Sequence, residues 1–332
     1  MHVIILTSLL GMTAAAETRQ LDNGMQVILK ENHGSPMIAS MVFVRSGSKY
    51  ESRFENGITH FLEHLLFDGT ANLSREEIDR SIRDLGGYIN AFTRKELTSF
   101  IVLLPKQYIT YGMTVQADML FNSTFPENEL PKERKVVIEE INRDADSPGS
   151  VAEAFFTEKA YAGTAYARPV LGYAPFIENI PRAAIVDYWR KYYRPENMTL
   201  LLIGDFDSDS MFTAAQQVFG KVALPGPAAS PPKPQSPDYG AIVGKNVYDT
   251  VATVKSTYVK LSLPAPRWND PDYLPFDLLV QYLNLDEISP LKQALLSGDK
   301  PMATEVDISL STYAEFSRLD ISVLTNDPAR RG

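Results

Sequence analysis

Alternating hydrophobic and polar residues predict strands along the first part of the chain. Residues 18–31 alternate around Asp22-Asn23-Gly24, a sequence typical of a β-hairpin turn, and residues 37–44 predict a further strand. Two more runs, 88–93 and 97–104, can pair across the short charged stretch between them. A strand is also predicted at 198–203.

Hydrophobic residues at helical spacing predict helices between these strands. Residues 74–85 open with Ser74 and Glu77 in the spacing of a capping box, and Gly86-Gly87 ends them. The stretch 145–180 has no clear period and is predicted to be irregular, with the next helix starting at Pro181. Further helices are predicted from about residue 56, at 107–121, from Pro131 to about 144, at 181–193 and up to 219.

A proline-rich stretch divides the chain. Residues 222–238 hold six prolines among small and polar residues, which indicates an extended, stiff linker. After it, a strand at 252–263, a helix at 272–283 and a strand pair within 303–324 repeat the order of the first half, at an offset of about 215 residues. The predicted parts are a first domain at 17–221, a linker at 222–244 and an incomplete second domain at 245–332, which would leave an apolar face uncovered.

Composition and charge narrow the possible functions. The chain is 44% hydrophobic and 22% charged, which is typical of a folded protein, and its 332 residues favour two domains or one unusually large one. A net charge of −9 with scattered Lys and Arg argues against nucleic-acid binding, and no segment reaches the about 18 apolar residues of a membrane span. Because cysteine is absent, a metal ion would need imidazole and carboxylate ligands.

The first sixteen residues are a short apolar run that ends on three alanines. This pattern favours a secretory signal peptide at 1–16, cleaved after Ala16, and predicts a periplasmic or secreted protein. A positively charged start is missing, so a buried N-terminal strand is the alternative.

Two of the four histidines lie in the segment His60-Phe61-Leu62-Glu63-His64. On a helix, His60 and His64 share one face and Glu63 borders it. This order is the inverted form of a zinc-peptidase signature, in which Glu63 is the general base that activates the attacking water. A surface helix that carries two histidines is the alternative.

A catalytic zinc requires a third protein ligand, which the charged helix after Pro131 can supply. Glu133 and Glu140 are two helical turns apart and share a face, whereas Glu139 points about 100° away from Glu140. We therefore predict Glu140 as the third ligand and Glu133 as a neighbour that orients or tunes the catalytic site. A solvated charged helix is the alternative.

These motifs resemble those of the pitrilysin, insulin-degrading enzyme and mitochondrial processing peptidase family, the inverzincin zinc metallopeptidases, in its bacterial exported type. The resemblance covers roughly residues 18–325 and includes the segments 86–93 and 193–198. It implies an α/β (α+β) clamshell of two related halves, each a mostly antiparallel sheet flanked by helices. It further implies one zinc ion per chain, in the first half, and peptide substrates.

The resemblance also implies which residues contact the substrate, and in one respect this sequence differs from active members of the family. It places Asn90 and Ala91 on an exposed edge strand that a peptide substrate extends, although an ordinary strand is the alternative. An Arg and a Tyr that active members present from the second half are absent from 295–304. A homologous partner subunit could supply that pair.

The expected function is that of a zinc-dependent endopeptidase that hydrolyses peptides or small unfolded polypeptides. The alternative is a noncatalytic or partner-dependent zinc-containing subunit, or a peptide-binding scaffold, of the same family.

Overall fold

A computed structural model describes residues 15–222, 247–252, 254, 256–285 and 288–326. Nearly all of the expected signal peptide at 1–16 and of the proline-rich linker at 222–244 lies outside these residues. The domain boundaries that depend on them therefore stay predictions.

Six strands form one sheet in the first half of the chain. They are arranged in the order β1-β2-β6-β3-β5-β4, and all neighbours are antiparallel except β2 and β6. The predicted hairpin is present as β1 and β2, and the predicted pairing of β4 with β5 is present as well, which confirms a mostly antiparallel sheet. The strands are β1 (Glu17–Gln20), β2 (Gln26–Glu31), β3 (Met37–Val44), β4 (Tyr88–Thr93), β5 (Thr98–Pro105) and β6 (Met198–Gly204).

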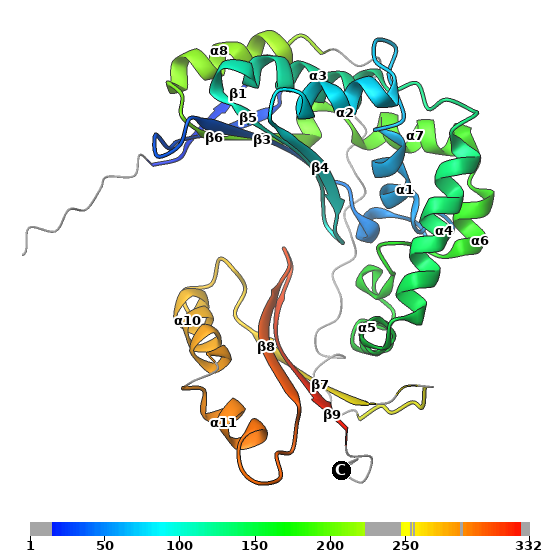
Figure 1. Cartoon of the computed structure of the whole chain (residues 1–332), viewed down its shortest axis with the longest axis vertical. Coiled ribbons are helices and arrows are strands. Elements are labelled where there is room, and N and C mark those ends of the chain that lie inside the picture. Colours follow the sequence, from blue (N-terminus) through cyan, green and yellow to red (C-terminus); the bar gives the residue numbers. More distant parts are fainter. Residues whose placement is uncertain (1–14, 223–246, 253, 255, 286–287, 327–332) are drawn as a thin grey trace, which may run out of the picture.

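Helices cover one face of this sheet. Figure 1 shows α2 (Arg75–Arg83), α3 (Ile109–Asn122) and α8 (Ser208–Val218) on that face, while the opposite face is turned toward the second half. Every second residue of β3 is buried, and one of these residues, Ser40, donates to Gln116 of α3 at 2.7 Å. The alternation read from the sequence therefore identifies the face of β3 that α3 covers.

Five more helices lie beside the β4 end of the sheet (Figure 1). The prediction of an irregular stretch at 145–180 is wrong, because α5 and α6 fall within it. None of the α5 residues is buried, so its sequence has no apolar face from which a helical period could be recognised. The five helices are α1 (Ile58–Leu65), α4 (Leu130–Asp146), α5 (Pro148–Ala160), α6 (Ala174–Asn179) and α7 (Arg182–Tyr192).

The second half contains a smaller sheet of three antiparallel strands in the order β7-β9-β8. In this sheet, as in the β3-β5-β4 part of the first sheet, the last strand in sequence lies between the other two, which supports the predicted repeat. Two helices accompany the sheet, and α10 packs on β8. The elements are β7 (Thr257–Ala265), α10 (Tyr273–Asn284), α11 (Pro290–Leu296), β8 (Glu305–Thr312) and β9 (Ser317–Thr325).

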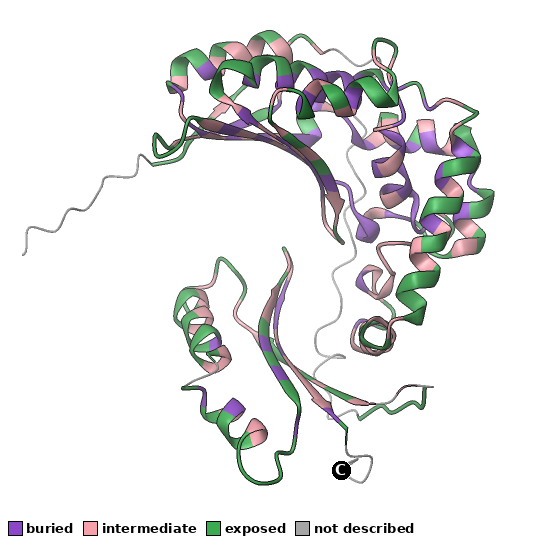
Figure 2. Ribbon diagram, in the orientation of Figure 1, coloured by how far each residue is buried: buried purple, intermediate pink, exposed green. Residues whose placement is uncertain are grey.

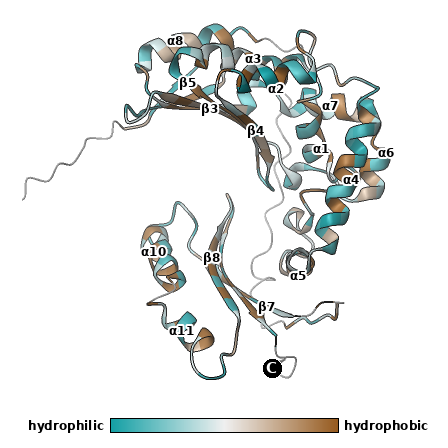
Figure 3. Ribbon diagram, viewed as in Figure 1, coloured by the Kyte–Doolittle hydropathy of each residue, from teal (hydrophilic) through white to brown (hydrophobic). Residues whose placement is uncertain are grey.

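The predicted uncovered apolar surface is present on the second half. Most residues of the second half are exposed or partly buried (Figure 2), and Figure 3 shows hydrophobic residues along α10. Leu274 and Leu278 on this helix are 74% and 71% exposed, whereas Val280 is buried against the sheet. Even so, no helix in the described part of the chain is long and apolar enough to cross a membrane.

The turn between β8 and β9 connects the second half to the first. Phe316 packs in an aromatic cluster with Tyr161 and Tyr166 of the first half. Beside this cluster, the buried Lys49 ammonium lies 2.6 Å from Glu96 and 3.1 Å from Glu315 of the second half. The connection therefore combines apolar packing with a largely desolvated ion pair.

Replacing Lys49 by Ala should destabilise this connection strongly, because Glu96 and Glu315 would lose a buried cation between them. Breaking a buried ion pair costs about 3–5 kcal/mol, and denaturant unfolding of the purified chain measures the loss. Lys260→Ala is the control, because Lys260 also pairs across the halves, with Glu153 of α5, but at a site where Glu153 is 55% exposed. The control should cost about 1 kcal/mol or less. Equal effects of the two substitutions would contradict the assignment of Lys49 as the main polar link.

Candidate metal centre

Helix α1 carries the two histidines on the side that faces away from the core. Its residues Phe61, Leu62 and Leu65 are fully buried and fix the rotation of the helix. The helix begins after Gly57, whose φ of 99° and close approach to Gly172 leave no room for a side chain. The apolar positions of the motif thus determine where its polar positions point.

His60, His64 and Glu140 converge on one point. The ring centroids of His60 and His64 are 4.8 Å apart. Glu140 Oε2, from α4, lies 3.8 Å from His60 Nε2 and 3.6 Å from His64 Nε2. Glu139 is exposed, and Glu140 is the one of the two whose carboxylate lies near both histidines.

The three side chains fit a zinc ion. Two ligands of a tetrahedral zinc, each about 2.0–2.1 Å from the ion, are about 3.4 Å apart, close to the distances from Glu140 to both imidazoles. Burial and the neighbouring His64 lower the pKa of His60 to about 3, so this imidazole is neutral at pH 7 and can act as a ligand. Among the described residues, these three form the one group of His and acidic side chains with such spacing.

Glu133 lies on the far side of His64 from Glu140. Its Oε2 is 3.3 Å from His64 Nδ1, and its other oxygen accepts from Arg75, which also binds Asp68 at 2.6 Å. The hydrogen bond with His64, assisted by Arg75, lowers the pKa of Glu133 to about 2. A charged Glu133 favours a proton on His64 Nδ1 and leaves Nε2 as the lone-pair nitrogen toward Glu140. This position agrees with the orienting role predicted for Glu133.

Glu63 is almost fully buried beside the two histidines. Its Oε2 accepts a hydrogen bond of 2.5 Å from Thr93, the last residue of β4. Burial raises the pKa of Glu63, although the bond from Thr93 opposes the shift. A carboxylate with a raised pKa is a better proton acceptor, which is what a general base requires.

Asn90 and Ala91 lie on β4, at the free edge of the six-stranded sheet. Asn90 is exposed and donates to Tyr88 on the same strand at 2.6 Å, whereas Ala91 is buried against the core. Because Thr93 at the end of this strand contacts Glu63, the free edge leads to the metal centre.

Sequence reasoning missed the roles of Arg75 and Thr93. Arg75 follows the helix cap Ser74, and Thr93 ends a predicted strand, so the sequence predicts the helix and the strand that carry them. No spacing in the sequence, however, indicates that these side chains reach Glu133 and Glu63.

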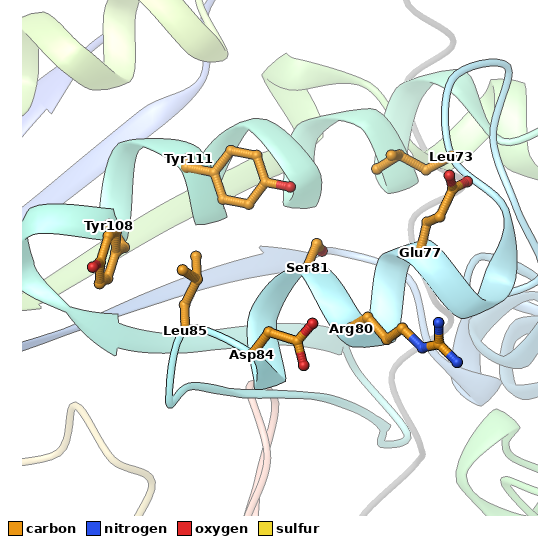
Figure 4. A pocket seen from close by; sticks show the side chains of 8 residues that line it. All are labelled: Leu73, Glu77, Arg80, Ser81, Asp84, Leu85, Tyr108 and Tyr111. Carbon is orange, nitrogen blue, oxygen red and sulfur yellow. The ribbon is translucent and has the colours of Figure 1, made fainter.

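A groove of about 580 Å³ lies elsewhere on the first half, between α2 and α3. Figure 4 shows Tyr108 and Tyr111 on one side of it and Arg80 and Asp84 on the other. None of its lining residues belongs to the metal centre, so concavity alone does not identify the site. The lining residues are Leu73, Glu77, Arg80, Ser81, Asp84, Leu85, Tyr108 and Tyr111.

Two family models match consecutive parts of the chain. The model described as Insulinase (Peptidase family M16) matches residues 26–174, and the model described as Peptidase M16 inactive domain matches residues 179–330. The first match contains all the residues of the metal centre described above.

Individual relatives agree with these matches. An uncharacterized zinc protease, YmxG, of Bacillus subtilis is 34% identical over 213 residues, which are 64% of this chain and 52% of the relative. The mitochondrial-processing peptidase subunit beta of Saccharomyces cerevisiae is 28% identical over 274 residues, 81% of this chain and 58% of the relative. The chain thus spans little more than half the length of these relatives.

A solved structure confirms the fold. The crystal structure of a protease from Helicobacter pylori superposes with a TM-score of 0.84 at 24% identity, over 95% of this chain and 76% of the other. The resemblance noted in the sequence is therefore confirmed: the chain belongs to the insulinase family, peptidase family M16.

Proposed function

We propose that the chain is a zinc-dependent endopeptidase in which His60, His64 and Glu140 hold one zinc ion and Glu63 is the general base. The observation that carries the proposal is the convergence of two Nε2 atoms and one carboxylate beside a buried second carboxylate. The name of the Bacillus subtilis relative, a zinc protease, supports it.

When bound by His60, His64 and Glu140, zinc would act as a Lewis acid toward water and the scissile carbonyl. Thr93 holds Oε2 of Glu63, and we assign proton transfer to Oε1. Glu63 takes the proton from the attacking water and returns it to the leaving amine. Glu133 keeps the imidazole of His64 oriented throughout.

The proposed substrates are peptides or small unfolded polypeptides. An extended peptide can pair with the free edge of β4, where its backbone N–H and C=O groups find partners with little dependence on side chains. Asn90 and Ala91 are the proposed contact positions, and the contact between Thr93 and Glu63 would bring such a peptide near the general base.

We further propose a homologous partner subunit and a location outside the cytoplasm. The partner would supply the Arg and Tyr that 295–304 lacks, and the yeast relative is itself named as a subunit. The location rests on the apolar run and alanines of residues 1–16.

A second candidate function is that of a noncatalytic zinc-containing subunit or peptide scaffold. The missing Arg and Tyr favour it, as does the match of 179–330 to a domain described as inactive. The presence of Glu63 beside the candidate ligands argues against it, because a scaffold does not require a base there.

Hydrolysis of a quenched fluorescent peptide, with and without a chelator, should distinguish the two functions. We expect the chelator to abolish hydrolysis and added zinc to restore it, because two imidazoles and a carboxylate bind zinc reversibly. The assay is run on the chain alone and after mixing with a homologous subunit that carries the Arg and Tyr. Stoichiometric zinc binding without hydrolysis in either condition would support the noncatalytic function. Full activity of the chain alone would remove the need for a partner.

A further inference from the structure

We infer that Glu51 is a positioning residue for the metal centre: its carboxylate caps the N-terminus of α1 and holds in place the helical turn that presents His60. The inference rests on the proposed zinc site and adds a residue that does not itself touch the metal or the substrate.

Helix α1 begins without a side-chain cap of its own. The residue at the cap position is Gly57, which has no side chain, and the first N–H groups of any α-helix lack partners within the helix. Glu51 fills this role from outside the helix. Its Oε2 accepts from the Gly57 N–H at 2.9 Å, and its Oε1 accepts from the Thr59 N–H at 2.9 Å.

The Glu51 carboxylate is buried and almost entirely committed to this contact. The residue is 3% exposed, and the Asn56 amide also donates to its carboxylate at 2.7 Å. Burial raises the pKa of Glu51 to about 7, against the opposing effect of the backbone hydrogen bonds from Thr59 and Gly57. The positive end of the helix dipole favours a carboxylate at this point. Because no side chain fits at position 57, a residue at the cap position itself cannot supply this cap, and it comes from another segment of the chain.

The cap also ties α1 to another part of the fold. Glu51 follows the short 3₁₀ helix Ser48–Tyr50, whose Lys49 binds Glu315 of the second half. Arg168 donates to the backbone oxygen of Glu51 from the other side. The segment that carries Glu51 is therefore held by Lys49 and by Arg168. Through its carboxylate, this segment also holds the start of α1.

The first turn of α1 is where the position of His60 is decided. Thr59, which Glu51 holds, directly precedes His60, and its hydroxyl contacts Tyr188 at 2.7 Å. Metal ligands need to be held within about 0.5 Å of their working geometry. A first turn that frays would move His60 relative to Glu140 before it moved His64, which lies one turn further along.

The substitution Glu51→Gln tests the inference. Glutamine keeps the size of the side chain, but its NH₂ group would face one of the two backbone N–H donors and leave it unpaired. We expect zinc affinity, measured by competition with a chromophoric chelator, to fall about tenfold or more, as for other groups that orient metal ligands. The absorption spectrum of the cobalt-substituted protein should change at the same time, because one imidazole is displaced.

Two controls separate positioning from general stability. Glu55→Gln alters an acid of the same loop that accepts from the Ser52 N–H, and it should leave zinc affinity unchanged. Gln116→Ala removes a buried hydrogen-bonding side chain under the sheet, so it should lower stability without weakening zinc binding. If Glu51→Gln does not fold, Glu51→Asp keeps the charge and is measured in its place.

Hydrogen exchange of the metal-free protein distinguishes failure of this inference from failure of the proposed zinc site. Faster exchange of the Gly57 and Thr59 amides in Glu51→Gln supports the cap whether or not the wild-type chain binds zinc. A wild-type chain that binds no zinc would overturn the proposed function and leave the cap standing. Unchanged exchange at both amides would overturn the inference. Unchanged zinc affinity and cobalt spectrum in a variant that folds would overturn it as well.

Discussion

Glu63→Gln should lower the rate of peptide hydrolysis by about two to four orders of magnitude while the protein still binds zinc. A carboxamide cannot take a proton from water, but its oxygen can still accept the hydrogen bond from Thr93, so the fold around the site is kept. Steady-state kinetics with a fluorescent peptide, together with metal analysis of the same sample, measures both effects.

The control for this variant is Glu139→Gln. Glu139 is exposed on α4 next to the candidate ligand Glu140, so its substitution removes a nearby charge without touching the site. We expect its activity to equal that of the wild type. A Glu63→Gln enzyme with wild-type turnover would show that proton transfer depends on another group.

His60→Ala should abolish zinc binding rather than slow the reaction at constant zinc content. The remaining pair, His64 and Glu140, offers two ligands where a catalytic zinc needs three from the protein. Metal analysis after dialysis should give one zinc per wild-type chain and close to none for the variant. The variant should also lose any rise in unfolding temperature that zinc gives the wild type, since a ligand stabilises only a state that binds it.

His33→Ala is the matched control, because it removes a histidine from the surface of the same half. His33 is 63% exposed and pairs at 2.7 Å with Asp205, which directly follows β6. The His33→Ala variant should retain one zinc per chain. Retention of zinc by His60→Ala would instead remove His60 from the ligand set.

The parts of the site that follow from helical spacing could be predicted from the sequence. His60 and His64 share a face because they are four residues apart, and Glu140 was preferred over Glu139 for the same local reason. The cap formed by Ser74 and Glu77 is likewise present, with both of its hydrogen bonds. Such features depend on a few neighbouring residues, so tertiary structure changes them little.

The contacts between elements could not be predicted, because they depend on where the elements meet. Arg75 reaches Glu133 only because the start of α2 lies beside α4. Glu51 reaches the start of α1 across a loop that has no regular period. Helix α5 was missed because none of its residues is buried, so its sequence carries no hydrophobic pattern. Helix α6 has six residues and one buried residue, Ile177, which is too little to define a helical period.

The position of β6 in the first sheet has a consequence for synthesis on the ribosome. This strand lies between β2 and β3, yet it is the last of the six in sequence. At about 5–20 residues per second, translation would need roughly 10–30 s after β3 before β6 emerges. During that interval the backbone N–H and C=O groups on the edges of β2 and β3 that β6 will fill have no native partner, and they are open to incorrect pairing. A chaperone that holds the nascent chain until residue 204 has emerged should therefore raise the yield of folded protein.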